Sequence, residues 1–249
     1  MAHKTLISGT AYSVTGGREL IGGTGYGCKA GKTLIGGTAF TVPFSKGIPL
    51  STITPGAILY LNESGSPVPF YIAKHDYESG LNGAGRTLLV RKENYDKRVW
   101  DATGKNNYPD STMDKWLNSE YLQLLSETVK AGISETKFYY SSMMTPLGIQ
   151  TMQRSVFTLS CTELNPISYP SYVLTEGEPL PIASILAENS QQWTRSPYTG
   201  NSYEVVYFGS GRNAYRQSAG WEKQSRPAFT LPATLAVVQN ADGTYTLAA

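Results

Sequence analysis

Three tandem copies of a fourteen-residue unit occupy the first 44 positions of the chain. Leu6, Leu20 and Leu34 hold equivalent places, and each is followed by Ile, a Ser-Gly or Gly-Gly pair, and Thr. A glycine pair between two apolar runs is typical of a tight β-hairpin. We therefore predict that each unit forms two short strands joined by a turn.

A hairpin of this size cannot bury its apolar face alone, so repeats need stacking neighbours or a partner surface. Three such units also make only a small core. We predict that residues 1–44 form a small all-β repeat module that attaches the chain to other proteins or to sister subunits, as a homo-oligomer with a trimer favoured. The alternative is a simple β meander packed on its own domain.

The composition argues against two classes of partner. The 249 residues carry a formal net charge of +2 and no basic patch stands out, so we expect no nucleic-acid binding. No apolar run approaches the length of a membrane span and no signal peptide follows Met1, so we expect no membrane insertion and no standard secretion. Cys28 and Cys161 are too few for a disulfide framework, and we predict two free, buried thiols.

Residues 45–249 have the pattern of a separate α+β domain. Seventeen Tyr and 25 Gly favour β structure with many tight turns. Residues 43–55 have the turn formers of a linker, and the stretch from Thr162 to Gln192 predicts a long, mostly irregular excursion. Strands are predicted over residues 57–62, 69–74, 86–91, 137–140, 155–161 and 203–208.

One helix is clear between these strands. Asp110 or Ser111 can cap its first turn, with Asp114 three residues after Ser111 in a box-like arrangement. Residues 126–131 predict a short second helix that ends at Gly132. Apolar residues at helical spacing form one stripe that we expect to face the core: Met113, Trp116, Leu117, Tyr121, Leu124 and Leu125.

The stretch from Trp193 to Leu231 has the composition of a binding surface. Its apolar, strand-like ends flank a middle rich in Tyr, Arg, Asn, Ser, Gln and Trp. Tyr, Trp and Arg contribute most of the binding energy at protein interfaces, while Ser, Gly and Asn add adaptable hydrogen bonds. We therefore predict a binding face presented by a rigid β scaffold.

Several motifs in this part of the chain resemble a known family. They are Asn107–Thr112, Lys115–Asn118, Val156–Glu163, Trp193–Tyr198 and Ser225–Pro232. In this order they are similar to a phage and prophage domain family of formally unknown function, over about residues 54–238. The repeat is similar to N-terminal segments of tail-associated proteins in phages of gut Firmicutes. The chain departs from many relatives at Gly220–Gln224, just before Arg-Pro-Ala.

The resemblance implies a C-type-lectin-like fold for residues 45–249, with receptor binding by the segment before the closing strand. In some related phage proteins a diversity-generating retroelement alters that segment. The ligand-binding residues predicted on this basis are Tyr203, Tyr207, Arg212, Asn213, Tyr215, Arg216, Gln217, Trp221, Glu222 and Lys223.

The implied function is a receptor-binding adhesin of a phage tail, made in the bacterial cytoplasm and located in the virion. Its partners would be a host cell-surface protein or glycan and other phage tail proteins. Two alternatives stay open. A structural virion component, such as a tail or capsid decoration, would use the same face to bind neighbouring subunits, and a cell-wall glycan hydrolase would need carboxylates such as Glu176 and Glu178.

The residues give little support to catalysis, so we predict no enzyme activity, no metal and no cofactor. His75 lacks the Gly-x-Ser-x-Gly elbow of a serine hydrolase, and we expect a surface or strand-end histidine. His and Cys lack zinc-site spacing, and Glu176 and Glu178 fit a solvated loop better than a calcium site. For Arg195 and Arg226 we expect structural roles, pairing with backbone carbonyls or a carboxylate.

Overall fold

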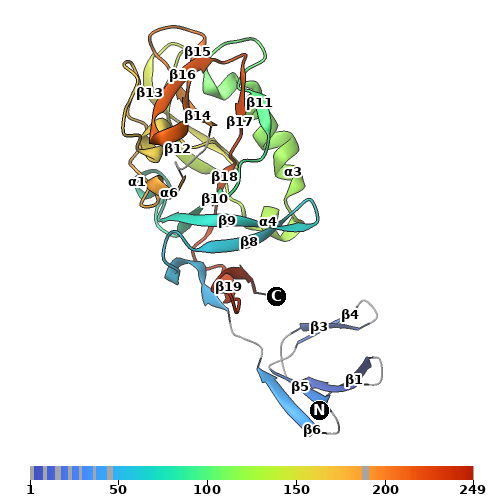
Figure 1. Cartoon of the computed structure of the whole chain (residues 1–249). Coiled ribbons are helices and arrows are strands. Elements are labelled where there is room, and N and C mark those ends of the chain that lie inside the picture. The colour runs from blue at the N-terminus through green and yellow to red at the C-terminus, as the bar shows by residue number, and fades with distance from the viewer. Residues whose placement is uncertain are drawn as a thin grey trace. The chain divides into compact units, whose positions relative to one another are not determined.

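The computed structural model of the chain describes residues 3–7, 10–14, 18–21, 24–27, 30–35, 38–43, 47–186 and 191–248. The chain divides into two units, Met1–Gly47 with Ala248–Ala249, and Ile48–Leu247 (Figure 1). Each unit is described below by itself.

Every repeat in the first unit forms a β-hairpin, which confirms the prediction from the Ser-Gly and Gly-Gly pairs. The hairpins are β1 (His3–Ile7) with β2 (Thr10–Val14), β3 (Arg18–Ile21) with β4 (Thr24–Gly27), and β5 (Ala30–Ile35) with β6 (Thr38–Pro43). The first and third hairpins join through β2 and β5 into a four-stranded sheet, and the β3–β4 hairpin forms a sheet of its own. Cys28 lies outside the described residues.

A seven-stranded sheet forms one end of the second unit, in the order β18-β10-β9-β8-β20-β19-β7. Its strands are β7 (Ile48–Pro49), β8 (Ile58–Glu63), β9 (Ser66–His75), β10 (Arg86–Arg91), β18 (Ala228–Pro232), β19 (Ala236–Gln239) and β20 (Tyr245–Leu247). Leu59, Phe70 and Phe229 are completely buried, and the two phenyl rings lie 5.3 Å apart. Apolar β-formers at alternating positions explain why three of these strands were predictable.

The prediction of a linker over residues 43–55 is wrong for its second half. Ile48–Pro49 pairs with β19, and the turn of 3₁₀-helix that follows, η1 (Leu50–Thr52), buries Leu50. Ile53 is also buried. Burial of Leu50 and Ile53 therefore fixes this segment to the sheet, although most of its other residues are typical of turns.

A five-stranded sheet stands beside the first, in the order β11-β17-β14-β15-β16 (Figure 1). Its strands are β11 (Lys97–Val99), β14 (Gln192–Pro197), β15 (Glu204–Phe208), β16 (Ala214–Ser218) and β17 (Glu222–Gln224). A separate hairpin joins β12 (Thr136–Ser142) to β13 (Gly148–Arg154). The predicted strands at 137–140 and 203–208 are thereby confirmed.

The predicted helix is confirmed, but it is not regular. It consists of α2 (Thr112–Trp116), one turn of π-helix, η3 (Leu117–Tyr121), and α3 (Leu122–Leu124). Ser111 caps it by accepting from the Asp114 backbone N–H at 3.1 Å. The extra residue of the π turn brings Trp116 and Tyr121, five positions apart, onto one face with ring centroids 5.5 Å apart. The predicted second helix is α4 (Glu127–Gly132).

The predicted strand over residues 155–161 is wrong. Asn118 Oδ1 accepts from the backbone N–H groups of Ser155 and Val156, and the Tyr108 hydroxyl accepts from that of Thr158. Side chains therefore take the backbone groups that a neighbouring strand would use. An isolated bridge from Phe157 to Ala228 and a hydrogen bond from the Arg195 N–H to the Leu159 carbonyl link this segment to the two sheets, but it does not form a strand.

The excursion between Thr162 and Gln192 is mostly irregular in its described part, as predicted. It holds the end of α5 (Cys161–Leu164) and the short α6 (Ala183–Leu186). The remaining short helical turns are α1 (Ser79–Asn82), η2 (Tyr108–Asp110) and η4 (Ser210–Arg212). Helices and largely antiparallel sheets, with a parallel pair in each of the two large sheets, make the second unit an α+β structure, which confirms that class. Among the described residues, no helix has the length and apolar character needed to cross a membrane.

Candidate functional site

Three aromatic side chains and a lysine form a row across the five-stranded sheet. Tyr207 of β15 lies opposite Trp193 of β14 on one side and opposite Tyr215 of β16 on the other. The Tyr207 and Tyr215 rings stack with centroids 5.6 Å apart, and Trp193 meets Tyr207 edge-on at 6.1 Å. Lys223 Nζ lies 4.3 Å from the Tyr207 ring centroid, within cation–π range. We call Trp193, Tyr207, Tyr215 and Lys223 the aromatic row.

The aromatic row runs from the core to the solvent. Trp193 is 1% exposed and its Nε1 donates to the Arg98 carbonyl at 3.0 Å, whereas Tyr215 is 42% exposed. Tyr207 between them is half-buried, and burial, followed by the nearby Tyr215, raises its pKa. Its hydroxyl is therefore neutral at neutral pH and can donate a hydrogen bond to a ligand.

Two more aromatic side chains project beside this sheet, Tyr203 with 54% and Trp221 with 61% exposure. They belong to neighbouring connections, because the Ala219 N–H donates to the Tyr203 carbonyl at 2.8 Å. The turn that carries Trp221 is held at Ala219, whose carbonyl accepts hydrogen bonds from the backbone N–H groups of both Trp100 and Asp101.

The loop that carries Tyr203 is held by a buried side chain. Asn106 is 1% exposed, and its Nδ2 donates to the carbonyls of Tyr198, Asn201 and Glu204 at 3.1, 2.9 and 2.8 Å. A single amide thus ties together both ends and the middle of this loop. Such fixation lowers the entropy cost of binding through an exposed ring.

Arg216 belongs to the opposite face of the same sheet. Successive residues of a strand point to opposite faces, so Arg216 is turned away from Tyr215. Its guanidinium lies 4.4 Å from the Tyr198 ring centroid and pairs with Glu204 at 3.2 Å. Tyr172 of the excursion meets Tyr198 edge-on at 5.8 Å. A second, smaller aromatic group therefore lies behind the aromatic row.

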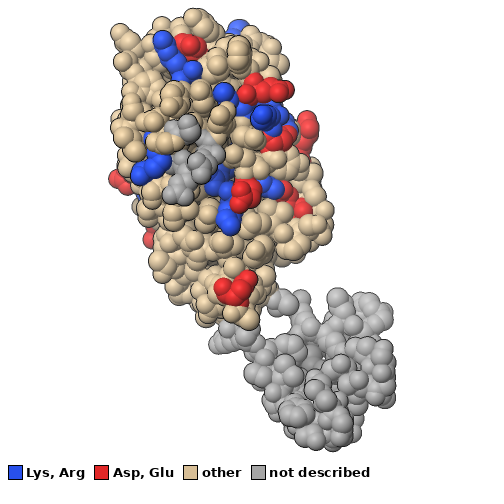
Figure 2. Space-filling view, viewed as in Figure 1, with Lys and Arg blue, Asp and Glu red and all other residues tan. Residues whose placement is uncertain are grey.

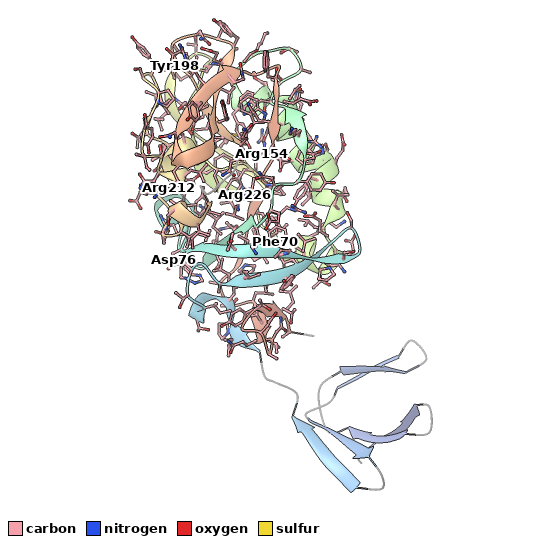
Figure 3. All side chains as sticks on the ribbon, in the orientation of Figure 1. Phe70, Asp76, Arg154, Tyr198, Arg212 and Arg226 are labelled. Atoms are coloured by element: carbon pink, nitrogen blue, oxygen red, sulfur yellow. The ribbon has the colours of Figure 1, made fainter. Side chains whose placement is uncertain are left out.

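Arg212 and Asn213 lie at the start of β16, along its outer edge. Arg212 is half-buried with a left-handed φ of 59°, and its carbonyl accepts from the Ile167 N–H. Asn213 forms an isolated bridge with Ser168 of the excursion. Arg212 is well separated from Tyr198 in the view of Figure 3.

The ten predicted binding residues therefore do not form one continuous patch. Tyr207, Tyr215 and Lys223 belong to the aromatic row, and Gln217 shares the face of Tyr215 by strand alternation. Tyr203, Trp221 and Glu222 lie at the rim of the sheet. Arg212 and Asn213 lie along the outer edge of β16, and Arg216 lies on the opposite face.

Residues 84–233 match the model of a family described as a domain of unknown function (DUF6273), which is more than half of the chain. The chain belongs to the DUF6273 family. The matched residues contain the five-stranded sheet and both aromatic groups. No curated protein and no solved structure is significantly similar to the chain.

A buried ionic cluster behind the sheet fixes the DUF6273 domain's excursion. Arg195 is fully buried, and its Nη1 donates to Glu163 at 2.7 Å and to the Thr158 carbonyl at 2.9 Å. Glu163, on α5, also accepts from the Tyr77 hydroxyl at 2.5 Å. Burial raises the pKa of Tyr77, and the Glu163 charge raises it further. The predicted structural role of Arg195 is confirmed.

Arg226 also has the predicted structural role. It is 5% exposed and donates to the backbone carbonyls of Arg91, Lys92 and Leu186. Burial lowers its pKa to about 10. It therefore links the end of β10 to the end of α6.

The prediction of a solvated loop is wrong for Glu176. This carboxylate is fully buried, and it accepts from the Ser141 N–H and from the Ser196 hydroxyl, each at 2.6 Å. Glu178 has the predicted exposure and pairs with Lys74 at 3.3 Å. One of the two glutamates is therefore buried and the other is exposed.

The remaining candidates have structural contacts. His75 ends β9, with Nδ1 2.9 Å from the Thr87 hydroxyl and Nε2 2.7 Å from the Ile53 carbonyl, so the strand-end prediction is confirmed. Cys161 is a free, buried thiol, as predicted, and burial raises its pKa. Within the described part of the chain, no group of three or more His, Cys, Asp or Glu residues is arranged to hold a metal ion.

Charge does not single out a site on the face shown in Figure 2. There, Lys and Arg atoms lie close to Asp and Glu atoms, and most of the second unit is uncharged. Exposed aromatic rings are the more distinctive feature. Tyr172, Tyr198 and Asn106 were not among the predicted binding residues, because their roles depend on contacts between distant segments. Trp193 was recognised only as the start of the binding stretch.

Proposed function

We propose that this DUF6273 chain is a receptor-binding protein of a phage particle, which recognises a host-surface ligand without chemistry. Its second unit would be a variant of the C-type-lectin-like fold. A helix near the start, a long irregular excursion and a final sheet support that assignment. The proposal takes its phage context from the resemblance of the five motifs and the repeat.

The observation that carries the proposal is the exposure of three aromatic side chains on a fixed framework. Tyr203, Tyr215 and Trp221 are each more than 40% exposed, although large aromatic rings are usually well buried. Backbone hydrogen bonds and the Asn106 amide hold their segments in place. Exposed and pre-organised Tyr and Trp are typical of binding surfaces.

These rings can stack on sugar rings or on apolar side chains, and Lys223 and Glu222 add charged contacts at the rim. A single contact surface of this size would bind weakly. Several copies on one particle would convert weak contacts into firm adhesion by raising the effective concentration. The repeat module would supply that attachment.

A structural virion component is the second candidate, and one observation favours it. β16 is the last strand of its sheet, and within the described residues only a bridge at Asn213 pairs its outer side. An open edge of this kind can accept a strand from a neighbouring subunit. Sequence variation concentrated at residues 206–224 among close relatives would favour recognition, and an invariant face would favour assembly. A hydrolase built on Glu176 is disfavoured, because that carboxylate is buried.

The proposal is tested with fluorescently labelled full-length chain and a panel of gut Firmicutes cells. Tyr215→Ala combined with Trp221→Ala should reduce cell binding by about tenfold or more, as expected for loss of two hot-spot rings. Leu147→Ala is the matched control, because Leu147 is 71% exposed but belongs to the turn between β12 and β13. Equal binding of the double variant and the unchanged chain would refute the recognition face.

A further inference from the structure

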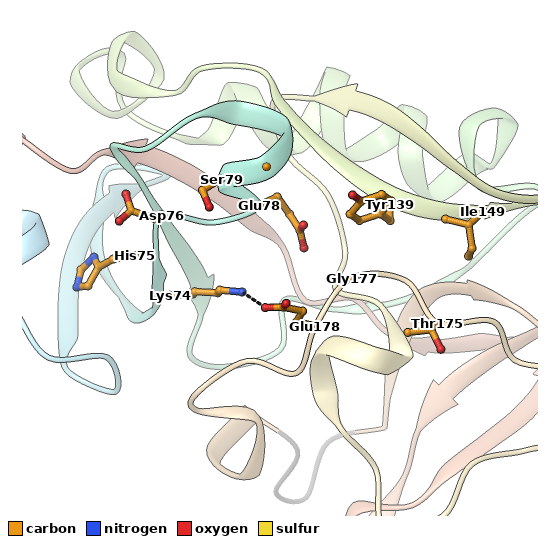
Figure 4. Close-up of a pocket in the computed structure, with 11 residues that line it drawn as sticks. Lys74, His75, Asp76, Glu78, Ser79, Tyr139, Ile149, Thr175, Gly177 and Glu178 are labelled. Atoms are coloured by element: carbon orange, nitrogen blue, oxygen red, sulfur yellow. Dashed lines mark hydrogen bonds and ion pairs between the residues drawn. The ribbon is translucent and has the colours of Figure 1, made fainter.

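A cleft on the side of the second unit is lined by residues that the aromatic row does not use. Its volume is about 610 Å³. Lys74 lines it from the end of β9, Asp76 and Glu78 from the connection between β9 and α1, Tyr139 from β12, and Glu178 from the excursion (Figure 4). Clefts of this size with a few convergent polar groups are the usual form of ligand sites.

Glu78 is the unusual group in the cleft. Its side chain is half-buried and points toward the Lys74–Glu178 ion pair (Figure 4). Among the described residues, none donates a hydrogen bond to this carboxylate or forms an ion pair with it. Buried or half-buried carboxylates normally have such partners, so Glu78 is left with acceptor capacity that faces the cleft.

The backbone conformations of Glu78 and Gly177 allow the Glu78 carboxylate to face the cleft. Glu78 has a left-handed φ of 48°, which is uncommon outside glycine. On the other side of the carboxylate, Gly177 has a φ of +81°, and a Cβ on it would lie 2.7 Å from Glu78 Oε1. A side chain at position 177 would therefore push the carboxylate out of its place.

The charges around the cleft are predominantly negative. Lys74 is the one cation among its lining residues, and it already pairs with Glu178 at 3.3 Å. Asp76 adds a further carboxylate, which accepts from the Gly85 N–H. Burial raises the pKa of Glu78 and the negative charge of Glu163 raises it further, and the net shift is upward although Arg195 and Lys74 oppose it. A bound cation beside Glu78 would stabilise the charged carboxylate and so oppose the effects of burial and of Glu163.

We propose that this cleft binds an ammonium or guanidinium group, with Glu78 as its acceptor and the Tyr139 side chain beside it. Such a cationic group could belong to a small free amine or to a Lys or Arg side chain of another protein. The cleft is separate from the aromatic row, and the inference does not rest on the proposed function.

The test is isothermal titration calorimetry of the full chain at neutral pH and low salt. The probes are agmatine, which carries both cationic groups, and peptides in which a single Lys or Arg is flanked by Gly. We expect saturable binding of at least one probe, and a loss of about tenfold in affinity in Glu78→Gln, the size of one charge-assisted hydrogen bond. Agmatine binding alone would identify a small-amine site, and tighter peptide binding would identify a protein side chain.

Glu120→Gln is the matched control, because Glu120 is exposed on η3 and outside the cleft. Gly177→Ala keeps the carboxylate but displaces it, so it should weaken binding as Glu78→Gln does. If Gly177→Ala fails to fold, Glu78→Gln alone decides. The inference is overturned if no probe binds saturably, or if Glu78→Gln binds as tightly as the unchanged chain.

Discussion

The ring of Tyr215 lies directly over Gly209, so that a Cβ on Gly209 would be 2.5 Å from Tyr215 Cε2. This contact places the ring against the backbone and against Tyr207, with which it stacks. The exposed end of the aromatic row therefore depends on the absence of a side chain at a residue outside the row.

Gly209→Ala should displace the Tyr215 ring while leaving the fold intact, because an exposed ring can rotate outward. We expect a loss of stability of about 1 kcal/mol and a clear change in near-UV circular dichroism as the Tyr207–Tyr215 stack is broken. Gly220→Ala is the control, since a Cβ there would meet only Ser218 Oγ at 3.9 Å. An unchanged near-UV spectrum in Gly209→Ala would contradict the packing of the row.

Asn106→Ala should loosen the loop that carries Tyr203. Three carbonyls lose their donor, and we expect a destabilisation of about 1–3 kcal/mol in urea unfolding. Cell binding should also fall, although Asn106 is only 1% exposed. Asn62→Ala, at an exposed position of β8, should change stability by less than about 0.5 kcal/mol. Full retention of binding in Asn106→Ala would show that Tyr203 needs no pre-organisation.

Arg195→Met should be strongly destabilising. The change leaves the Glu163 and Glu176 carboxylates buried without their cation, which typically costs about 3–5 kcal/mol. Arg216→Met is the comparison, because Arg216 is 48% exposed and its pair with Glu204 should contribute about 0–1 kcal/mol. Equal unfolding free energies for the two variants would argue against the buried cluster as the anchor of the excursion.

Asp114 should make stability fall as the pH rises from about 4 to 6. Burial raises its pKa from 3.8 to about 6, although the nearby Arg154 opposes this shift. The folded state thus holds the proton more tightly than the unfolded state. The resulting stabilisation is complete below pH 3.8 and is lost as the pH rises through about 6.

The measurement is the unfolding free energy of the unchanged chain minus that of Asp114→Asn, as a function of pH. This difference should decrease by on the order of 1–3 kcal/mol across that interval, because other titrating groups cancel. A difference that increases with pH would mean that the ion pair with Arg154, at 2.9 Å, outweighs burial.

Local patterns in the sequence determined much of the secondary structure. The Ser-Gly and Gly-Gly pairs indicated the three hairpins, Asp110 and Ser111 indicated the start of the helix, and the apolar stripe from Met113 to Leu125 indicated its buried face. These features depend on residues within a few positions of each other. Hairpin turns, caps and helical periodicity are therefore visible without a fold.

Only the tertiary structure decided where polar groups would find partners. Asn118 and Tyr108 accept hydrogen bonds from the backbone N–H groups of Ser155, Val156 and Thr158, which a neighbouring strand would otherwise use. Arg195 forms ion pairs with Glu163 and Glu176, which come from distant segments. The same holds for the site, where strand pairing brings Tyr215 against Tyr207, and Arg216, on the opposite face, meets Tyr198. A buried polar group needs a partner, but the sequence does not state which distant residue supplies it.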